Sequence, residues 1–240
     1  PLPGHDAIVA LLGRAVAAIG DAPKATVAIA QVDELLKGLP GVCVLVDRHE
    51  LVASITSRLD QLDAFMAELD RMLESGEVPA AELEARNAEA IALHDALWAV
   101  RNDRLRTARE VALLAGRDSS QGALAAYLAI QQALSALDRL EVRGRDSAGI
   151  HVFVHDHGLE ADDPAVQALF GGRTTDPTFQ SGSVRFFDGV LSFVYKAAAE
   201  IGELGDNTAA LRSAMAQDDL LRLALRQPEA RLSIVDFAKS

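Results

Sequence analysis

Cysteine and aromatic residues are scarce in this sequence. The 240-residue chain has one cysteine, Cys43, and only 5% of its residues are aromatic, with one Trp and two Tyr. A single thiol excludes an internal disulfide framework and a zinc site built from several cysteines, and it is typical of a reducing compartment. The core must therefore consist mainly of aliphatic residues. Because Ala and Leu favour helix, the composition predicts a helix-rich protein.

Basic charge and long apolar runs are also lacking. The net charge is −12 and the isoelectric point is about 4.9. The most basic stretch, 101–109, contains Asp103 and is followed by Glu110, which indicates a solvated helix face rather than a phosphate-binding patch. No apolar run approaches the ~20 residues that a helix needs to cross a bilayer. We therefore expect no nucleic-acid partner and no membrane partner.

The chain opens without a targeting signal. Residues 1–6, Pro-Leu-Pro-Gly-His-Asp, contain no initiator Met and no basic region that leads into an apolar stretch. They are therefore not a signal peptide. We expect a cytoplasmic protein, and we expect this sequence to be a fragment or a processed form of a longer chain.

Helical patterns fill the first half of the sequence. Apolar residues recur at spacings of three and four over 8–19, 23–36, 50–73 and 79–114. Because a short connector joins the last two segments, we expect them to form a long antiparallel helical hairpin. The apolar run 42–46 is compatible either with a buried strand or with the start of the next helix.

Strand-like segments mixed with helices follow in the second half. This order indicates an α+β fold, with a helical domain or insertion at 1–120 and a second domain at 121–240. The segment 186–195 is either one strand with a bulge at Gly189 or two strands joined by a tight Asp-Gly turn. The other expected elements are a helix at 121–141, a strand at 150–155, a helix at 165–170 with its cap at Asp162-Asp163-Pro164, a helix at 208–217 capped by Asn207, a helix from 218–219 to about 228, and a strand at 232–237.

The most specific segment lies at 137–150, with the sequence Leu-Asp-Arg-Leu-Glu-Val-Arg-Gly-Arg-Asp-Ser-Ala-Gly-Ile. Gly144 permits a sharp backbone turn after the helix. Asp146 and Ser147 can bond to neighbouring backbone groups and hold that turn. Arg143 would then present a planar fork of donors from a rigid base.

This segment resembles the helix–turn–strand signature of class II glutamine amidotransferases, the group that includes glucosamine-6-phosphate synthase and amidophosphoribosyltransferase. The family carries Arg-Gly-Tyr-Asp-Ser-Ala-Gly, or a close variant, after a Leu-x-x-Leu-Glu helix. Arg145 stands here where the family usually has Tyr or Gln, and Val142 where it often has Tyr or His. The firm similarity covers 134–154, and a weaker one covers 191–215.

The resemblance implies an αββα sandwich, part of which would follow the helical half, and an N-terminal-nucleophile mechanism. An N-terminal Cys, expected before Pro1, would attack glutamine with its own α-amine as base, and the released ammonia would pass to a sugar-phosphate acceptor in a second domain. Arg143 would lie near the nucleophile, Gly144 would form the turn, and Asp146 and Ser147 would brace it. The resemblance implies no cofactor and no metal, and we expect a homo-oligomer.

Several family features are missing from the sequence. The chain has no His-Thr-Arg-Trp motif and no Asn-Gly oxyanion pair in the expected places, and Cys43 lies in an apolar run where a thiol is unreactive. The simplest explanation is a helical insertion at 1–120 within an amidotransferase domain of which the sequence holds only a part. This chain alone is then expected to be inactive.

Three hypotheses remain open. The first is a glutamine amidotransferase domain that feeds ammonia to a sugar phosphate. The second is a non-catalytic descendant whose helical hairpin mediates oligomerisation or partner binding. The third is an unrelated helical interaction protein, in which the segments around Ile150 and Leu191 would not pair as antiparallel strands.

Other chemically suggestive residues have simpler explanations. His151, His155 and His157 would spread over roughly 20 Å of a strand at ~3.3 Å per residue, too far apart for one metal ion. His94 and Trp98, one helical turn apart, are expected to pack in the core or to hydrogen-bond to a neighbouring helix. The segment 171–173, Gly-Gly-Arg, lacks the Lys-Ser/Thr of a phosphate-binding loop.

Overall fold

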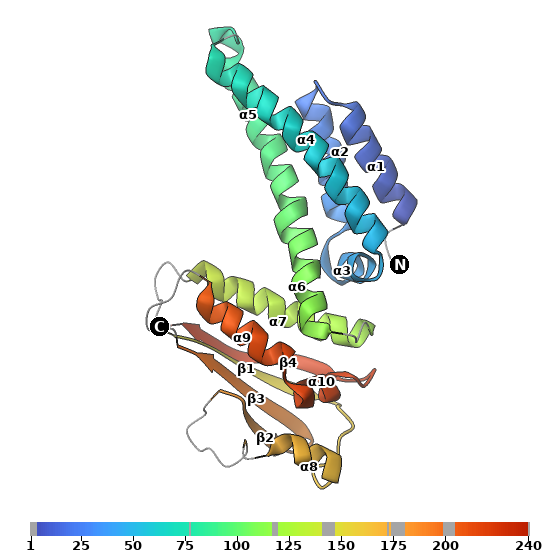
Figure 1. The fold of residues 1–240 in the computed structure, drawn as a ribbon, viewed down its shortest axis with the longest axis vertical. Helices are drawn as coiled ribbons and strands as arrows, with labels where there is room; N and C mark the ends of the chain where they lie inside the picture. The colour runs from blue at the N-terminus through green and yellow to red at the C-terminus, as the bar shows by residue number, and fades with distance from the viewer. Residues whose placement is uncertain are drawn as a thin grey trace. The chain divides into compact units, whose positions relative to one another are not determined.

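The computed structural model describes residues 4–76, 78–116, 120–140, 147–171, 173, 181–198 and 205–239 (Figure 1). Contacts divide the chain into two compact units, Pro1–Arg109 and Glu110–Ser240, which are described separately below. The sequence placed this division after residue 120. The predicted α+β class, with a helical N-terminal half, is confirmed.

All regular secondary structure among the described residues of the first unit is helical. Helices α4 and α5 lie side by side as the expected hairpin, and Gly76 ends α4 in a left-handed conformation with φ 77°. The predicted continuous helix after Pro79 instead contains a π-helical segment, η1, between α5 and α6. The bounds are α1 His5–Ala17, α2 Ala22–Leu35, α3 Gly38–Asp47, α4 His49–Ser75, α5 Ala80–Trp98, η1 Ala99–Leu105 and α6 Arg106–Ala115, which continues into the second unit.

Helix α3 resolves the ambiguity of the apolar run 42–46, which is helical and not a strand. Val44 and Leu45 pack in the core of the unit with Ile55 of α4. The helix can start so soon after α2 because Gly41 has no side chain. A Cβ atom at Gly41 would lie 1.9 Å from the carbonyl oxygen of Leu36.

The second unit is a four-stranded sheet with helices packed on it. Its strand order is β2-β3-β1-β4, and every pair of neighbouring strands is antiparallel. Figure 1 shows α7 and α9 along one side of this sheet. The bounds are α7 Gln121–Leu140, β1 Ala148–His155, α8 Pro164–Phe170, β2 Ser183–Phe187, β3 Val190–Ala197, α9 Asp206–Ala216, α10 Asp219–Leu225 and β4 Arg231–Lys239.

The two faces of the sheet differ in burial. Helices α7 and α9 cover the face that carries Val152, Phe193 and Tyr195, all of which are buried. The other face carries His151 and Phe153, which are half-buried. The described residues of this unit thus form one sheet with α7 and α9 on one face, and a second sheet, as in a complete αββα sandwich, is not among them.

Local signals account for most of the element ends. Asp188 and Gly189 have φ values of 48° and 73°, so the segment 186–195 is two strands joined by a tight hairpin turn of the type that needs two positive φ values. Asp163 caps α8 as expected, its carboxylate accepting a hydrogen bond from the Ala165 N–H. The expected cap at Asn207 is wrong: α9 begins at Asp206, after Gly205, and Asn207 is buried in the first turn. Within the described ranges, no helix combines the length and the apolarity needed to span a bilayer.

Candidate functional site

The predicted substrate-site residues fall largely outside the described part of the chain. Arg143, Gly144 and Asp146 lie in the gap between α7 and β1, so their positions are not described. Ser147 is described; it is half-buried and lies immediately before β1. The structure therefore shows where the signature segment is anchored, at the end of α7 and the start of β1, but not its turn.

Cys43 has the environment of an unreactive thiol. It is buried in α3, and burial, together with the nearby charge of Asp47, raises the pKa of its thiol. A raised pKa lowers the thiolate population at neutral pH, and the thiolate is the nucleophilic form. Cys43 is therefore a small core residue, as its apolar neighbours predict.

Two of the three second-half histidines, His151 and His157, lie in different environments. His151 Nε2 is 2.8 Å from Ser192 Oγ on the open face of the sheet. His157 lies beyond the end of β1, is 2% exposed, and accepts a hydrogen bond at Nδ1 from the Leu159 N–H. Among the described residues, no group of histidine, cysteine or carboxylate side chains is placed to hold a metal ion.

The expectation for His94 and Trp98 is wrong. Both side chains are exposed on the outer surface of α5, and Trp98 retains 49% of its accessible surface. The core side of the same helix is formed by Ala90, Leu93 and Leu97. The helix packs against the core along one stripe, and His94 and Trp98 lie off that stripe.

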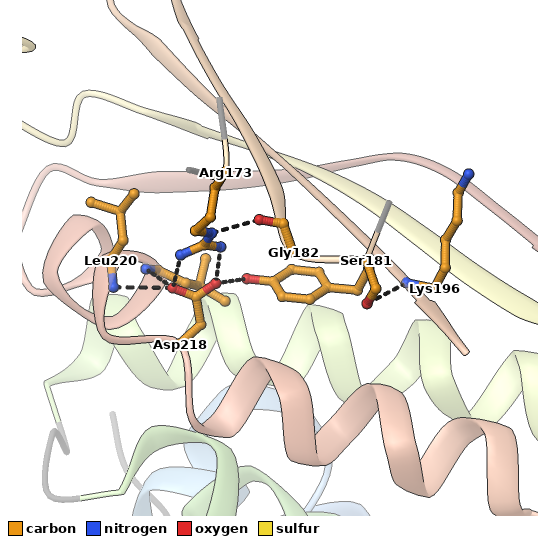
Figure 2. A network of polar contacts seen from close by, with 8 residues as sticks. Arg173, Ser181, Gly182, Lys196, Asp218 and Leu220 are labelled. Carbon is orange, nitrogen blue, oxygen red and sulfur yellow. Dashed lines mark hydrogen bonds and ion pairs between the residues drawn. The ribbon is translucent and has the colours of Figure 1, made fainter. Parts of the chain in front are cut away.

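A buried polar network joins Arg173, Tyr195 and Asp218 in the second unit (Figure 2). The Arg173 guanidinium donates two hydrogen bonds to the Asp218 carboxylate, with 3.1 Å between Nη1 and Oδ1. The Tyr195 hydroxyl donates to Asp218 Oδ2 at 2.7 Å. Arg173 also donates to the carbonyl of Gly182, at the start of the β2–β3 hairpin. Three segments that are distant in sequence thus meet at one carboxylate.

The same carboxylate caps a helix. Asp218 Oδ1 accepts hydrogen bonds from the backbone N–H groups of Leu220 and Leu221, at 3.0 and 3.1 Å. These are two of the first N–H groups of α10, which have no partner within the helix. The carboxylate therefore accepts five hydrogen bonds, and its side chain is 5% exposed.

The network fixes the ionisation of its members. Burial alone would raise the pKa of Asp218, but the hydrogen bonds from Arg173 and Tyr195 outweigh burial and hold this pKa below its ordinary value. Burial and the adjacent negative charge of Asp218 raise the pKa of Tyr195 well above its ordinary value. At neutral pH the network therefore consists of a guanidinium, a carboxylate and a neutral phenol.

A cavity of about 480 Å³ adjoins the network. Polar groups from Arg173, Ser181, Gln217 and Asp219 line it, together with apolar residues of α8. Because Arg173 is already neutralised and the lone pairs of Asp218 are occupied, neither offers a free charge or a free base to a ligand. The network stabilises the junction of the β2–β3 hairpin and α10 rather than providing a nucleophile or a general base.

A second cavity, of about 700 Å³, lies beside the open face of the sheet and includes the His151–Ser192 pair. Burial lowers the pKa of His151, and the charge of Asp236, its cross-strand neighbour on β4, opposes that effect. A hydroxyl 2.8 Å from a neutral imidazole resembles a nucleophile–base pair in distance. However, Ser192 is 4% exposed in the middle of β3, where such a hydrogen bond serves to satisfy a buried hydroxyl.

The network around Asp218 was not predicted from the sequence. In the sequence, Arg173 belongs only to an incomplete phosphate-binding loop, and Asp218 marks only the start of a helix. One signal was present: Tyr195 is one of only two tyrosines and lies in an apolar strand, where its hydroxyl needs a buried partner. The partner itself could not be identified, because it is 23 residues away in the sequence.

Comparisons with family models, with curated proteins and with solved structures found no match to this chain. Any statement about its activity must therefore come from its own residues and their arrangement.

Proposed function

We propose that this chain is part of a class II glutamine amidotransferase domain that carries a helical insertion at its N-terminal side. The proposal rests on one observation: the strand that follows the signature segment, β1, pairs antiparallel with β3, so that Ile150 lies opposite Tyr195 and Val154 opposite Leu191. The amidotransferase hypothesis expects this pairing, whereas the hypothesis of an unrelated helical protein expects none.

The order of elements in the second unit supports the same proposal. Helix α7 leads through the signature segment to β1. Helix α8 and the β2–β3 hairpin follow, and then α9 and α10 lead to β4, which completes the other side of β1. The resemblance implies this succession of helix, strand, strand and helix before the glutamine-binding motif. The open face of the sheet, with Phe153 half-buried, is a suitable surface for the second sheet of a sandwich.

The proposed chemistry is glutamine hydrolysis. The thiolate of an N-terminal Cys attacks the side-chain amide carbon, ammonia leaves, and water hydrolyses the resulting thioester to release glutamate. Arg143 holds the nucleophile's loop from the turn formed by Gly144, with Asp146 and Ser147 as braces. The ammonia is transferred to a sugar phosphate in a second domain, in a cytoplasmic homo-oligomer. No cofactor or metal takes part.

The test is covalent labelling of the intact native protein with an electrophilic glutamine analogue, followed by peptide mass spectrometry. We expect an adduct on a Cys that precedes Pro1. An adduct on Cys43 instead would place the active site in the helical half and would overturn the alignment. A folded protein that forms no adduct would favour the non-catalytic scaffold.

A matched pair of arginine variants tests the signature segment itself. Arg143→Ala should slow labelling by about a hundredfold, because misplacing a reacting group by about 1 Å costs roughly that factor. Arg139→Ala, four residues earlier on the exposed end of α7, should label at the native rate. Equal rates for both variants would remove the role proposed for Arg143.

A further inference from the structure

The segment that joins β1 to α8, residues 156–163, is held at one buried histidine. The side chain of His157 is buried, and its Nδ1 accepts a hydrogen bond from the Leu159 N–H at 3.0 Å. Its ring makes a T-shaped contact with the ring of Phe186 in β2, with 5.3 Å between the centroids. One side chain thus connects the segment 156–163 to the β2–β3 hairpin.

The contacts of His157 favour its neutral form. Because Nδ1 accepts a hydrogen bond, the proton of the neutral ring is on Nε2, and no acceptor among the described residues completes a hydrogen bond with Nε2. The Gly189 carbonyl favours the charged form, but burial is the larger effect and lowers the pKa of His157. A second proton, on Nδ1, would face the Leu159 N–H, so two donors would oppose each other and a charge would be buried.

The charged groups around His157 do not offset its burial. Asp156 and Glu160 are the carboxylates whose charge reaches it, and both are exposed. Asp156 is also paired with Arg231 of β4, with 2.8 Å between Nε and Oδ2. His155, at the end of β1, opposes a second positive charge on its neighbour. The contacts from the hairpin, a phenylalanine ring and a backbone carbonyl, are uncharged.

The backbone of this segment is held in a conformation that it does not favour by itself. Asp156 and Gly158, on either side of the histidine, have φ values of 54° and 62°. A left-handed conformation is unfavourable for a residue other than glycine, so Asp156 adopts it only because its surroundings impose it. Loss of the contacts of His157 would therefore let the segment relax.

The segment is also part of the wall of the cavity of about 700 Å³ beside the sheet. Ala161 lines this cavity, and its carbonyl accepts a hydrogen bond from the side chain of Gln167, which lines it as well. Phe186, the ring that His157 contacts, lines the cavity from β2. Two walls of the cavity therefore meet at His157.

We propose that His157 is an acid-sensitive latch, which holds the segment 156–163 against the β2–β3 hairpin when it is neutral and releases the segment when it is protonated. The release is local, because β1 stays paired with β3 on one side and with β4 on the other. The latch is closed above pH ~6.5 and opens as the pH falls through the lower folded-state pKa of His157. This proposal does not depend on the proposed hydrolysis of glutamine.

Hydrogen exchange of single amides in the intact protein, followed by NMR, tests the latch. The Leu159 amide reports the bond to Nδ1 directly, and the Phe193 amide, in the middle of β3, reports the sheet. From pH ~6.5 down to the folded-state pKa, the opening constant at Leu159 should rise about tenfold per pH unit, after correction for intrinsic rates, because the open segment takes up one proton.

Low concentrations of urea distinguish local release from unfolding of the whole unit. At pH 5.5 the exchange of Leu159 should be insensitive to urea, since a local opening exposes little surface, whereas the exchange of Phe193 should accelerate. If Leu159 exchanges only together with Phe193 and with the same urea dependence, the segment does not open separately and the proposal is wrong.

A matched pair of asparagine variants tests the assignment to His157. In His157→Asn the side-chain oxygen can still accept the N–H two residues on, in an Asx turn, but it does not titrate. The opening constant at Leu159 should then change by less than about twofold between pH 7 and pH 5. His155→Asn, a half-buried histidine two residues earlier, should keep the native pH dependence. The slope is the readout, because loss of the contact with Phe186 raises exchange at every pH. A native slope in His157→Asn, or a lost slope in His155→Asn, would overturn the proposal.

Discussion

At the scale of single residues, two glycines of the helical unit lie in opposite environments. Gly41 is in α3, where a Cβ atom would lie 1.9 Å from the Leu36 carbonyl oxygen and 2.7 Å from the Leu36 Cα. Gly13 is in the middle of α1 with nothing within 4 Å of the corresponding position. The first glycine is required by the close approach of two backbones, whereas the second leaves its helix less stable than an alanine would.

These environments predict opposite effects for the same substitution. Gly41→Ala should lower the free energy of unfolding of the first unit by about 2–3 kcal/mol, because backbone atoms must move to admit the methyl group. Gly13→Ala should raise it by about 0.5–1 kcal/mol, the difference in helix propensity. Urea unfolding followed by the fluorescence of Trp98 measures both. Destabilisation by both variants to a similar extent would contradict the packing of α3 against the end of α2.

At the scale of secondary-structure elements, α10 and the β2–β3 hairpin are held together through Asp218. The carboxylate caps the helix and pairs with Arg173, while Tyr195 reaches it from the buried face of β3. A buried charge that loses its partner is costly, whereas an exposed ion pair contributes little. The stability of this junction should therefore depend on Asp218 far more than on its neighbour in sequence.

Two asparagine variants measure this dependence. Asp218→Asn can still cap α10 but leaves Arg173 without its counter-charge, so it should cost about 3 kcal/mol. Asp219→Asn, whose side chain is 69% exposed and pairs with Arg222 one turn away, should cost no more than about 0.5 kcal/mol. Hydrogen exchange of α10 and of the hairpin reports the change. Comparable losses of hydrogen-exchange protection in the two variants would mean that the network contributes little to stability.

The network also predicts a response to acid. The pKa of Asp218 is lower in the folded protein than in the unfolded chain, where it is about 3.9. Its contribution to stability is therefore fully present above pH ~4 and is lost as the pH falls through the lower folded-state value.

At the scale of the whole molecule, the two units differ in their buried titratable groups. His157, in the second unit, is buried, and burial lowers its pKa, opposed by the carbonyl of Gly189. In the first unit, His49 and His94 are exposed and His5 is only half-buried. As the pH falls from neutral to mildly acidic, the second unit should therefore lose more stability than the first.

The sign of this effect follows from the direction of the pKa change. The stabilisation that buried, neutral His157 contributes is fully present above the unfolded-state pKa of about 6.5 and is lost as the pH falls through the lower folded-state pKa. Protonation of His157 Nδ1 also breaks the hydrogen bond that this atom accepts from the Leu159 N–H. Hydrogen exchange between pH 7 and pH 5, corrected for intrinsic rates, should show opening in residues 110–240. His157→Gln should reduce this dependence, and His49→Gln should leave it unchanged. A larger effect in residues 1–109 would contradict the assignment.

The sequence by itself determined the features that arise from neighbouring residues. The spacing of apolar residues indicated the hairpin of α4 and α5. Asp163 and Asp218 marked helix starts, because a carboxylate can accept the first free N–H groups. Asp188-Gly189 offered the positive φ values of a tight turn. Each of these signals acts on backbone only a few residues away, so the local sequence is sufficient to predict its effect.

Only the tertiary structure decided the features that depend on which distant segments meet. It made the run 42–46 a helix, left Trp98 exposed on the outer side of α5, and placed Arg173 against Asp218, 45 residues further along the chain. A sequence pattern shows that a residue is apolar or charged, but not which partner will bury it or neutralise it. Partners are selected by packing that involves the whole unit, and this is why the polar network became visible only in the folded chain.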